Sequence, residues 1–264
     1  MFLDTDRSFF QRVLLAKSDF ARGLIVVLAL LATVFSAHGD TLQELDTKRE
    51  QARSAYDLEA CRVLLKEIQE VIGEDPADDS ARFSLANAAL ATAELQRITF
   101  EETKAPLADR RAMGKVIDEA AKLGLRALEG LAESSEKYRV RADLYGLMTR
   151  THYQGTKFGK RMDKATEMAL ELGEDNPHAY VTGSKRLLFA KARRGGDVEE
   201  ALALLNRALE LDSEHVMGLV LRGTAYEKLE DFDLAQRDWE RALELNPKCK
   251  PAKDKLEALS KPAH

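Results

Sequence analysis

The residue types that most often do chemistry in proteins are sparse and scattered along this sequence. The cysteines form no C-x-x-C pair, and no two histidines have the spacing of an H-E-x-x-H metal site. G-x-G-x-x-G, P-loop and G-x-S-x-G motifs are also missing. The histidines are His38, His152, His178, His215 and His264. The sequence therefore predicts no catalytic residues, no cofactor and no metal, and an enzyme is the least favoured class of function.

Two loops have the composition of ligand sites, but a structural interpretation is favoured for both. The acidic run EDPADDS at residues 74–80 lacks the twelve-residue order and closing Glu of a calcium loop. It is more typical of a solvated turn that caps a helix. Gly195-Gly196 before Asp197 is similar to a phosphate-binding loop. Its position between two predicted helices favours an ordinary interhelical turn.

The composition indicates a helical protein with a buried core. Of the 264 residues, 45% are hydrophobic, 32% are charged and only 6% are aromatic, which excludes global disorder and disfavours a β-sheet protein. The net charge of -5 disfavours nucleic-acid binding, which needs a clustered basic surface. Two cysteines exclude a disulfide-stapled fold. Cys61 and Cys249 lie near opposite ends of the predicted array and are not expected to form a disulfide.

The N-terminal segment resembles an export signal. Residues 1–22 include four basic residues, and the uncharged apolar run Gly23–Ala37 follows. Fifteen helical residues span about 22 Å, which is shorter than a hydrocarbon core of about 30 Å. Small residues follow the run, so residues 1–39 are predicted to be a signal peptide cleaved after Gly39. The alternatives are an uncleaved membrane anchor at residues 23–37 and a buried core helix. The first two interpretations place the rest of the chain outside the cytoplasm, in the periplasm, secreted or at a membrane.

A repeat is visible in the C-terminal half of the chain. The pentapeptide RALEL at residues 207–211 recurs at residues 241–245, an offset of 34 residues. The same offset relates Asp197 to Asp231 and Ala201 to Ala235. A period of 34 residues, with helical patterning on both sides of a turn, indicates repeated helix-turn-helix units.

The last unit resembles a tetratricopeptide repeat (TPR) in detail. Large, small and large residues mark its first helix, and small, large and small residues mark its second. They are Leu219, Gly223, Tyr226, Ala235, Trp239 and Ala242, and Pro247 closes the unit. The resemblance is strong over residues 178–211 and 215–247. It implies an all-α fold, a right-handed α-solenoid of about four TPR-like helix pairs.

The helix pairs are predicted at roughly 80–131, 141–173, 178–211 and 215–246. Residues 40–79 are predicted to form an N-terminal helical cap, and residues 80–264 to form the solenoid. Residues 57–72 form an amphipathic helix that could merge with a helix before it. A terminal helix is expected at 251–260.

The resemblance also implies a concave binding face, lined by the first helix of each pair. The family's positions on that face map to a basic set in one repeat and a mixed set in the last. The mapped residues are Arg186, Arg193, Arg194, Val220, Thr224, Glu227 and Lys228. Lys185 and Lys191 lie alongside the arginines, and Arg193 and Arg194 are expected in the final turn of their helix. Arginine forks there would suit an anionic or C-terminal carboxylate ligand. The alternative is a solvated helix face.

The predicted function is a non-catalytic scaffold that binds a protein or peptide partner in the cell envelope through its concave face. No nucleic acid is expected, and membrane contact is expected only if the N-terminal segment is not cleaved. The alternative is a periplasmic ligand-binding subunit associated with a solute transporter. That layout is similar to the TPR-containing T components of bacterial uptake systems, and it would need an apolar tunnel near Leu144, Leu147 and Met148.

Overall fold

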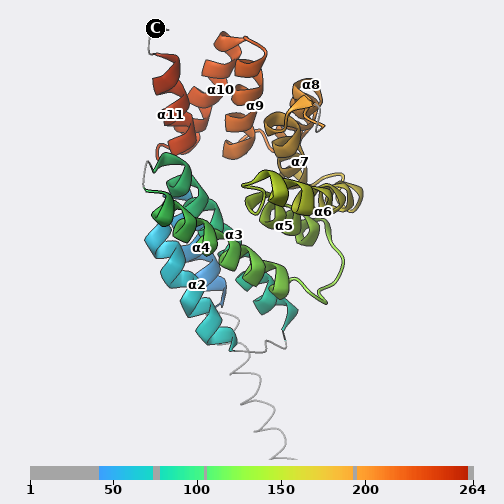
Figure 1. Ribbon diagram of the computed structural model, residues 1–264. Helices are drawn as coiled ribbons and strands as arrows, with labels where there is room; N and C mark the ends of the chain where they lie inside the picture. Colours follow the sequence, from blue (N-terminus) through green and yellow to red (C-terminus); the bar gives the residue numbers. More distant parts are fainter. Residues whose placement is uncertain (1–41, 74–77, 104–105, 193–194, 261–264) are drawn as a thin grey trace, which may run out of the picture. The chain divides into compact units, whose positions relative to one another are not determined.

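The computed structural model describes residues 42–73, 78–103, 106–192 and 195–260 (Figure 1). The chain divides into two compact units, Met1–Leu45 and Asp46–His264, and the helices labelled in Figure 1 lie in the second. All regular structure in the described residues is helical, which confirms the predicted all-α class. The predicted signal or anchor at residues 1–39 lies outside the described residues.

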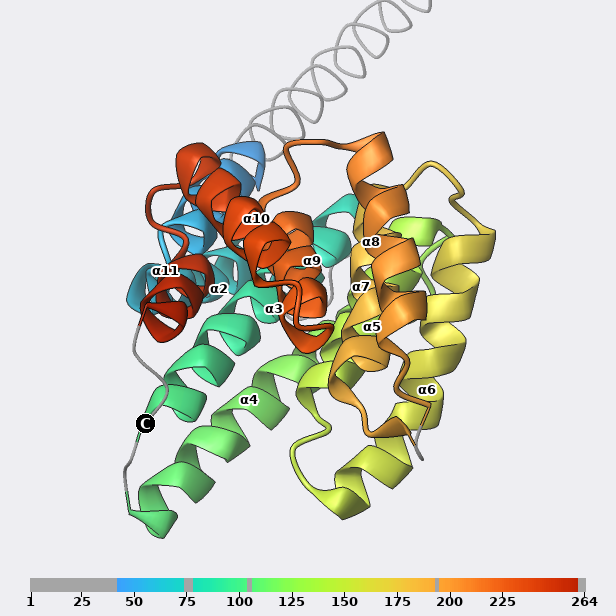
Figure 2. The ribbon, with the colours of Figure 1, turned by 90° about the horizontal axis from the view of Figure 1, so that it is seen from above.

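Four antiparallel helix pairs make up most of the second unit, as predicted (Figures 1 and 2). The pairs are α3 (Asp79–Glu102) with α4 (Leu107–Ala127), α5 (Ser135–Leu147) with α6 (His152–Glu171), α7 (Pro177–Phe189) with α8 (Val198–Leu211), and α9 (Val216–Lys228) with α10 (Phe232–Leu245). Each pair packs on the next. Before them α2 (Leu58–Ile72) packs on α3, and after them α11 (Lys250–Leu259) packs on α10.

Most of the helices begin at a side chain that accepts a hydrogen bond from the first turn, and α4, α10 and α11 do not. The Asp57 carboxylate accepts from the Ala60 N–H at 2.9 Å, and the Asp197 carboxylate accepts from the Glu200 N–H at 2.9 Å. Thr151 and Gln154 form a reciprocal capping box at the start of α6. Such caps each stabilise a helix by about 0.5–2 kcal/mol, so the local sequence fixes where these helices start.

Two predicted boundaries need correction. The second pair starts at Ser135 rather than near residue 141, because the Ser134 hydroxyl accepts a hydrogen bond from the Lys137 N–H at 3.2 Å and caps α5. Helix α7 ends at Phe189, earlier than predicted, and Arg193 and Arg194, expected in its final turn, lie outside the described residues. The chain turns early because Ala190 is extended and the Asp197 N–H donates to the Leu187 carbonyl at 3.0 Å.

A sharp turn separates α2 from the helical residues that precede it, so the two do not merge. Residues 46–54 are helical, and Tyr56 then adopts a φ of 58°. This left-handed conformation is uncommon for a residue with a side chain, and it is maintained only where surrounding contacts favour it. The turn therefore points to specific packing around the Tyr56 ring.

Small residues bring the helices of the last pair close together. A Cβ atom built on Gly223 of α9 would lie 2.5 Å from Nε1 of Trp239 and 2.9 Å from the carbonyl oxygen of Ala235. Trp239 is fully buried, and its indole N–H donates to the Val220 carbonyl at 3.1 Å. This is the small-against-large packing that the sequence pattern predicted, and it leaves little room for larger side chains.

An ion pair lies at the edge of this packing. The Arg222 guanidinium of α9 donates two hydrogen bonds to the Asp238 carboxylate of α10, both at 2.8 Å. A third bond joins Arg222 to the Asn206 side chain of α8 at 3.3 Å. Asp238 is only 6% exposed, and its buried charge is compensated because the guanidinium fork matches both carboxylate oxygens. One side chain thus ties three successive helices together.

We expect the substitution Ala235→Leu to lower the free energy of unfolding by about 1–3 kcal/mol, because added methylenes overpack a close helix contact. Ala235 is fully buried, and its carbonyl lies beside the Gly223 contact. The measurement is urea unfolding followed by circular dichroism. The matched control is Gln236→Leu on the exposed side of the same helix, which should change stability by less than about 0.5 kcal/mol. Equal stability of the two variants would contradict the packing described here.

Candidate partner-binding surface

Of the basic set predicted at the end of α7, the structure describes only Arg186. Nη1 of Arg186 lies 2.9 Å from the Asp163 carboxylate of α6, and its guanidinium also lies against Gly195 in the turn after α7. Arg193 and Arg194 lie outside the described residues. Arg186 therefore lies beside α6 and is paired with a carboxylate of that helix.

Two of the predicted α9 residues are buried, which corrects the expectation that they face a partner. Val220 and Thr224 are each only 4% exposed. The Val220 carbonyl accepts hydrogen bonds from the Thr224 hydroxyl at 2.9 Å and from the Trp239 indole at 3.1 Å. Val220 belongs to the apolar core of the last repeat, which includes Cys249 and against which Tyr56 packs.

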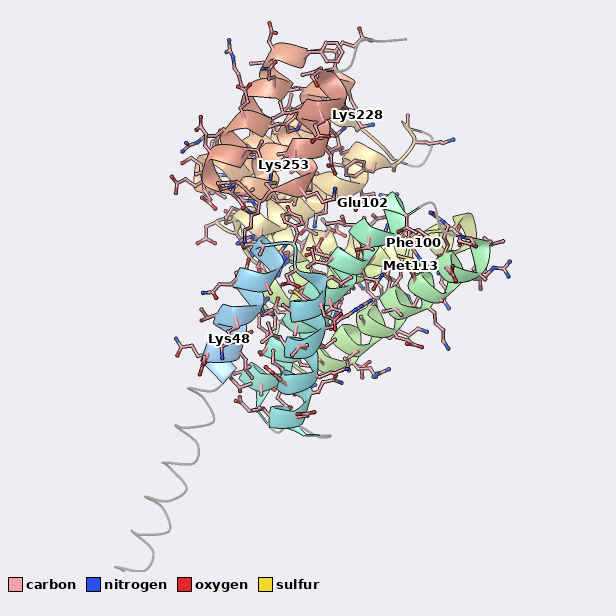
Figure 3. All side chains as sticks on the ribbon, turned by 90° about the vertical axis from the view of Figure 1, so that its left-hand side faces the viewer. Lys48, Phe100, Glu102, Met113, Lys228 and Lys253 are labelled. Carbon is pink, nitrogen blue, oxygen red and sulfur yellow. The ribbon has the colours of Figure 1, made fainter. Side chains whose placement is uncertain are left out.

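The other two α9 residues differ in their surroundings. The Glu227 carboxylate is bound by Lys255 of α11, whereas Lys228 is exposed (Figure 3). Of the four residues predicted on α9, only Lys228 is exposed. Two of the four mapped residues are therefore core, one is held by α11 and one is exposed.

The first helices of the unit contact the last repeat, and this contact contributes to burying it. The Tyr56 hydroxyl and the Cys249 thiol lie 3.6 Å apart, and the Asn246 side-chain amide donates to the Ser54 carbonyl at 3.0 Å. Further along, the Lys250 ammonium lies 3.1 Å from the Glu102 carboxylate at the end of α3 (Figure 3 labels Glu102). Burial raises the pKa of the Tyr56 hydroxyl, with the neighbouring Cys249 as a further cause. This turn is therefore part of the core of the last repeat.

A second polar cluster joins the early helices to α7. Asp143 of α5 is 7% exposed, and its carboxylate lies 2.7 Å from Nζ of Lys185 and 3.0 Å from Nη1 of Arg139. The Thr182 hydroxyl donates to the same carboxylate at 3.0 Å. Burial alone would raise the pKa of Asp143, but attraction to Lys185 and Arg139 outweighs it and the pKa is lowered. Lys185, which sequence reasoning placed beside the binding arginines, is thus engaged within the protein.

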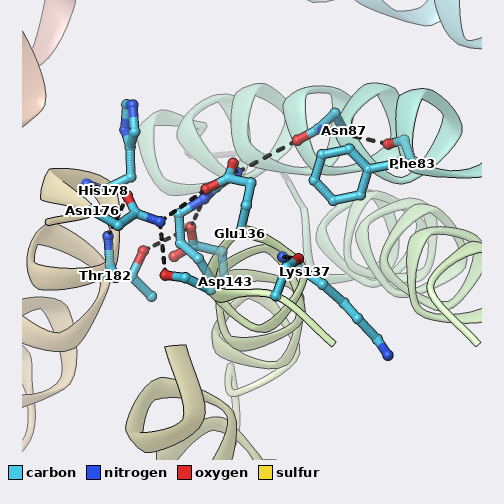
Figure 4. A network of polar contacts seen from close by, with 12 residues as sticks. Phe83, Asn87, Glu136, Lys137, Asp143, Asn176, His178 and Thr182 are labelled. Carbon is cyan, nitrogen blue, oxygen red and sulfur yellow. Dashed lines mark hydrogen bonds and ion pairs between the residues drawn. The ribbon is translucent and has the colours of Figure 1, made fainter. Parts of the chain in front are cut away.

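The same cluster extends across three helix pairs (Figure 4). The Arg139 guanidinium donates to the Glu136 carboxylate at 2.5 Å and to the Asn87 side chain of α3 at 3.5 Å. The Asn176 amide that begins α7 donates to the Ser135 hydroxyl at 2.9 Å. These bonds fix α3, α5 and α7 relative to one another. No short sequence motif predicts the bonds between different helices, because their partners lie about 40 to 50 residues apart.

Two histidines near the starts of α7 and α9 form a hydrogen-bonded pair: His178 lies in the first turn of α7, and His215 is the N-cap of α9. Nε2 of His215 and Nδ1 of His178 lie 2.9 Å apart. Nδ1 of His215 accepts the Gly218 N–H at 3.0 Å and so cannot carry a proton itself. His215 is therefore the Nε2–H tautomer and donates to His178. Burial, together with the nearby His178, lowers the pKa of His215 to about 4. Burial also lowers the pKa of His178.

Neither a metal-binding group nor a membrane-spanning helix is found in the described residues. Within them, no group of three or more His, Cys, Asp or Glu side chains is placed to bind a metal ion. No helix among the residues described is long and apolar enough to cross a membrane. Leu144, predicted to line a tunnel in the transporter alternative, is fully buried, and a Cβ on Gly124 of α4 would lie 2.9 Å from it. Leu144 therefore fills a close contact between α4 and α5.

The histidine pair predicts a pH dependence of stability. Because the pKa of His215 is lowered in the folded state, its ring stays neutral there at a pH at which the ring of the unfolded chain, with a pKa near 6.5, is protonated. The stabilisation is complete above about pH 6.5 and is lost as the pH falls towards 4. His215→Asn keeps a good N-cap without the titrating ring. Between pH 7 and 4.5 the wild type should lose about 1–2 kcal/mol more stability than the variant in urea unfolding. Identical losses would show that the pair does not couple to folding.

Comparison with known proteins agrees with this geometry. The tetratricopeptide repeat family model matches residues 217–249, which comprise α9, α10 and the turn after them. The peptidyl-prolyl cis-trans isomerase FKBP4 of Homo sapiens is 45% identical over 56 residues, and that of Mus musculus is 46% identical. These matches cover 21% of this chain and 12% of the length of the relatives.

The whole array also has a structural counterpart. A thermophilic TPR protein of Thermus thermophilus matches with a TM-score of 0.56 and 17% identity, covering 82% of this chain and 97% of that one. At this identity the likeness shows the fold alone. Residues 217–249 thus match the tetratricopeptide repeat family, and the stacked helix pairs have the fold of a tetratricopeptide-repeat solenoid.

Proposed function

We propose that this chain is a non-catalytic scaffold that binds a protein or peptide partner in the cell envelope. The observation that carries the proposal is the array of four stacked helix pairs, which in TPR proteins typically serves protein interaction. The isomerase activity named in the FKBP4 relatives is not carried over, because the match covers 12% of their length.

The proposed partner binds an outer surface of the helix pairs, because the inner positions of the last repeat are occupied. Val220 and Thr224 are buried, and Glu227 is bound to Lys255. Within the described chain, Lys228 is the exposed residue of the predicted set, and Arg186 and Glu227 are partly exposed but held in ion pairs. This departs from the concave-face binding that the sequence favoured.

The functional test is affinity capture from fractionated cells with the full chain as bait, followed by titration of each captured protein against the purified chain. A scaffold should retain at least one protein that binds again in a purified two-component titration. The control is the Ala235→Leu variant at a temperature at which it is largely unfolded and the wild type is folded, because a binder that recognises the folded array should then bind only the wild type. Failure of every captured protein to bind in the purified titration would contradict the proposal.

The envelope location gives a separate prediction. The uncharged run Gly23–Ala37 and the small residues after it support export. N-terminal sequencing of the native protein should return Asp40 or a near neighbour if the signal is cleaved. Met1 on a membrane-bound chain would support the anchor instead. A chain with Met1 that fractionates with soluble cytoplasmic proteins would refute the envelope location.

A further inference from the structure

The outer face of α6 carries a row of positively charged side chains. Lys157, Lys160, Arg161 and Lys164 are all exposed, and their spacings of three and four residues place them on one side of the helix. Among the residues that the structure describes, no carboxylate forms an ion pair with any of the four. Tyr153 lies nearer the N-terminal end of the same helix and is 74% exposed.

Other helices of this chain pair such charges with acidic residues one turn away. These pairs span three or four residues, with distances of 3.2 Å for Arg62–Glu59, 3.1 Å for Arg207–Glu210, 2.8 Å for Arg241–Glu244 and 3.1 Å for Lys250–Asp254. Within the row on α6, the four cations are neighbours of one another at these spacings. Asp163, the one carboxylate between Lys157 and Lys164, pairs with Arg186 of α7 instead. The row therefore departs from the pattern of those helices.

The four cations are unfavourable neighbours within α6. Like charges three and four residues apart on a helix repel each other. The first turn of α6 contains no acidic residue that would offset them. A local arrangement that opposes stability is typical of a functional surface.

The row is also partly ordered before any partner binds. Nζ of Lys157 lies 5.2 Å from the centre of the Phe158 ring, and the Arg161 guanidinium lies 6.0 Å from the centre of the Tyr145 ring. These cation–π contacts orient two of the four side chains. Ordered side chains lose less conformational entropy on binding.

The charge pattern along the helix selects the class of partner. The cationic row covers about 10 Å from Lys157 to Lys164. Glu167 and Glu171 follow on the same side of the helix and are exposed. A broad anionic surface such as a lipid bilayer would place its charges against these two carboxylates. A short acidic stretch of polypeptide matches the row and ends before them.

We propose that the outer face of α6 binds a short acidic segment of a protein partner. The inference rests on the scaffold function proposed above and names the surface and the chemistry of its partner. Lys157, Lys160, Arg161 and Lys164 contact the carboxylates of the segment. Electrostatic attraction speeds association and favours acidic partners. Salt screens this attraction, so binding weakens as the salt concentration rises.

The test uses the purified full chain and a labelled Ala-rich helical peptide with glutamates at spacings of three and four residues. The variant is the triple change Lys157→Gln, Lys160→Gln and Lys164→Gln. Its matched control removes three exposed lysines from α2, α4 and α11, through Lys66→Gln, Lys122→Gln and Lys253→Gln. Fluorescence anisotropy at about 50 mM and 300 mM salt gives the affinities. The same peptide with lysines in place of glutamates tests the sign of the charge.

The wild type should bind the acidic peptide, and the α6 triple variant should bind it about tenfold more weakly or worse, while the control stays within about twofold. Higher salt should weaken wild-type binding by about tenfold. Absence of wild-type binding, equal loss in the control, or binding of the lysine peptide would each overturn the proposal. So would α6-dependent binding to phosphatidylglycerol vesicles without binding to the peptide.

Stability and native partners give independent readouts. Removing the repulsion should leave the melting temperature of the α6 triple variant equal to or above that of the wild type, and a fall of more than about 4 °C would contradict the unfavourable arrangement. The single reversal Lys160→Glu should by itself weaken peptide binding by about threefold or more. If a captured partner binds the wild type and the triple variant equally, the scaffold function stands and the α6 surface is refuted.

Discussion

Close approach of two helices at a small residue is the constraint from which this fold follows. At Gly223 the backbone of α9 leaves room for Trp239, and at Gly124 the backbone of α4 leaves room for Leu144. A helix pair built this way buries one side but leaves an apolar edge, which only the next pair can cover. The stacking of α3 to α10 therefore follows from the same small-against-large contacts that hold each pair together.

Polar contacts then determine how neighbouring helix pairs are positioned relative to one another. The buried carboxylate of Asp143 on α5 accepts from Lys185 and Thr182 of α7, and Arg222 of α9, which is paired with Asp238, also donates to Asn206 of α8. Breaking such a buried pair leaves an uncompensated charge and is strongly destabilising. Lys185, which the sequence placed beside the predicted binding arginines, is one of the cations in these clusters. The four cations on α6 differ, because no carboxylate among the described residues pairs with them.

The sequence predicts what is periodic and misses what is not. The 34-residue offset located the last two helix pairs, and the family pattern located Gly223 and Trp239, because repeated units have repeated cores. Lys185 with Asp143 and Tyr56 with Cys249 lie 42 and 193 residues apart, and no repeat spacing relates them. The burial of Val220 and Thr224 follows from such long-range packing, so residues mapped from the family to an open face proved to be core.

The contact between the Tyr56 turn and the last repeat changes how the array should unfold. A linear solenoid melts from its ends, because a terminal repeat contacts a neighbour on one side only. Here Ser54 and Tyr56 are bonded to Asn246 and Cys249, so both ends of the unit share one core. Fraying of one end exposes the other, and stepwise melting gives way to a single cooperative transition. Forming that contact also requires a very long loop to close, which places it late in folding.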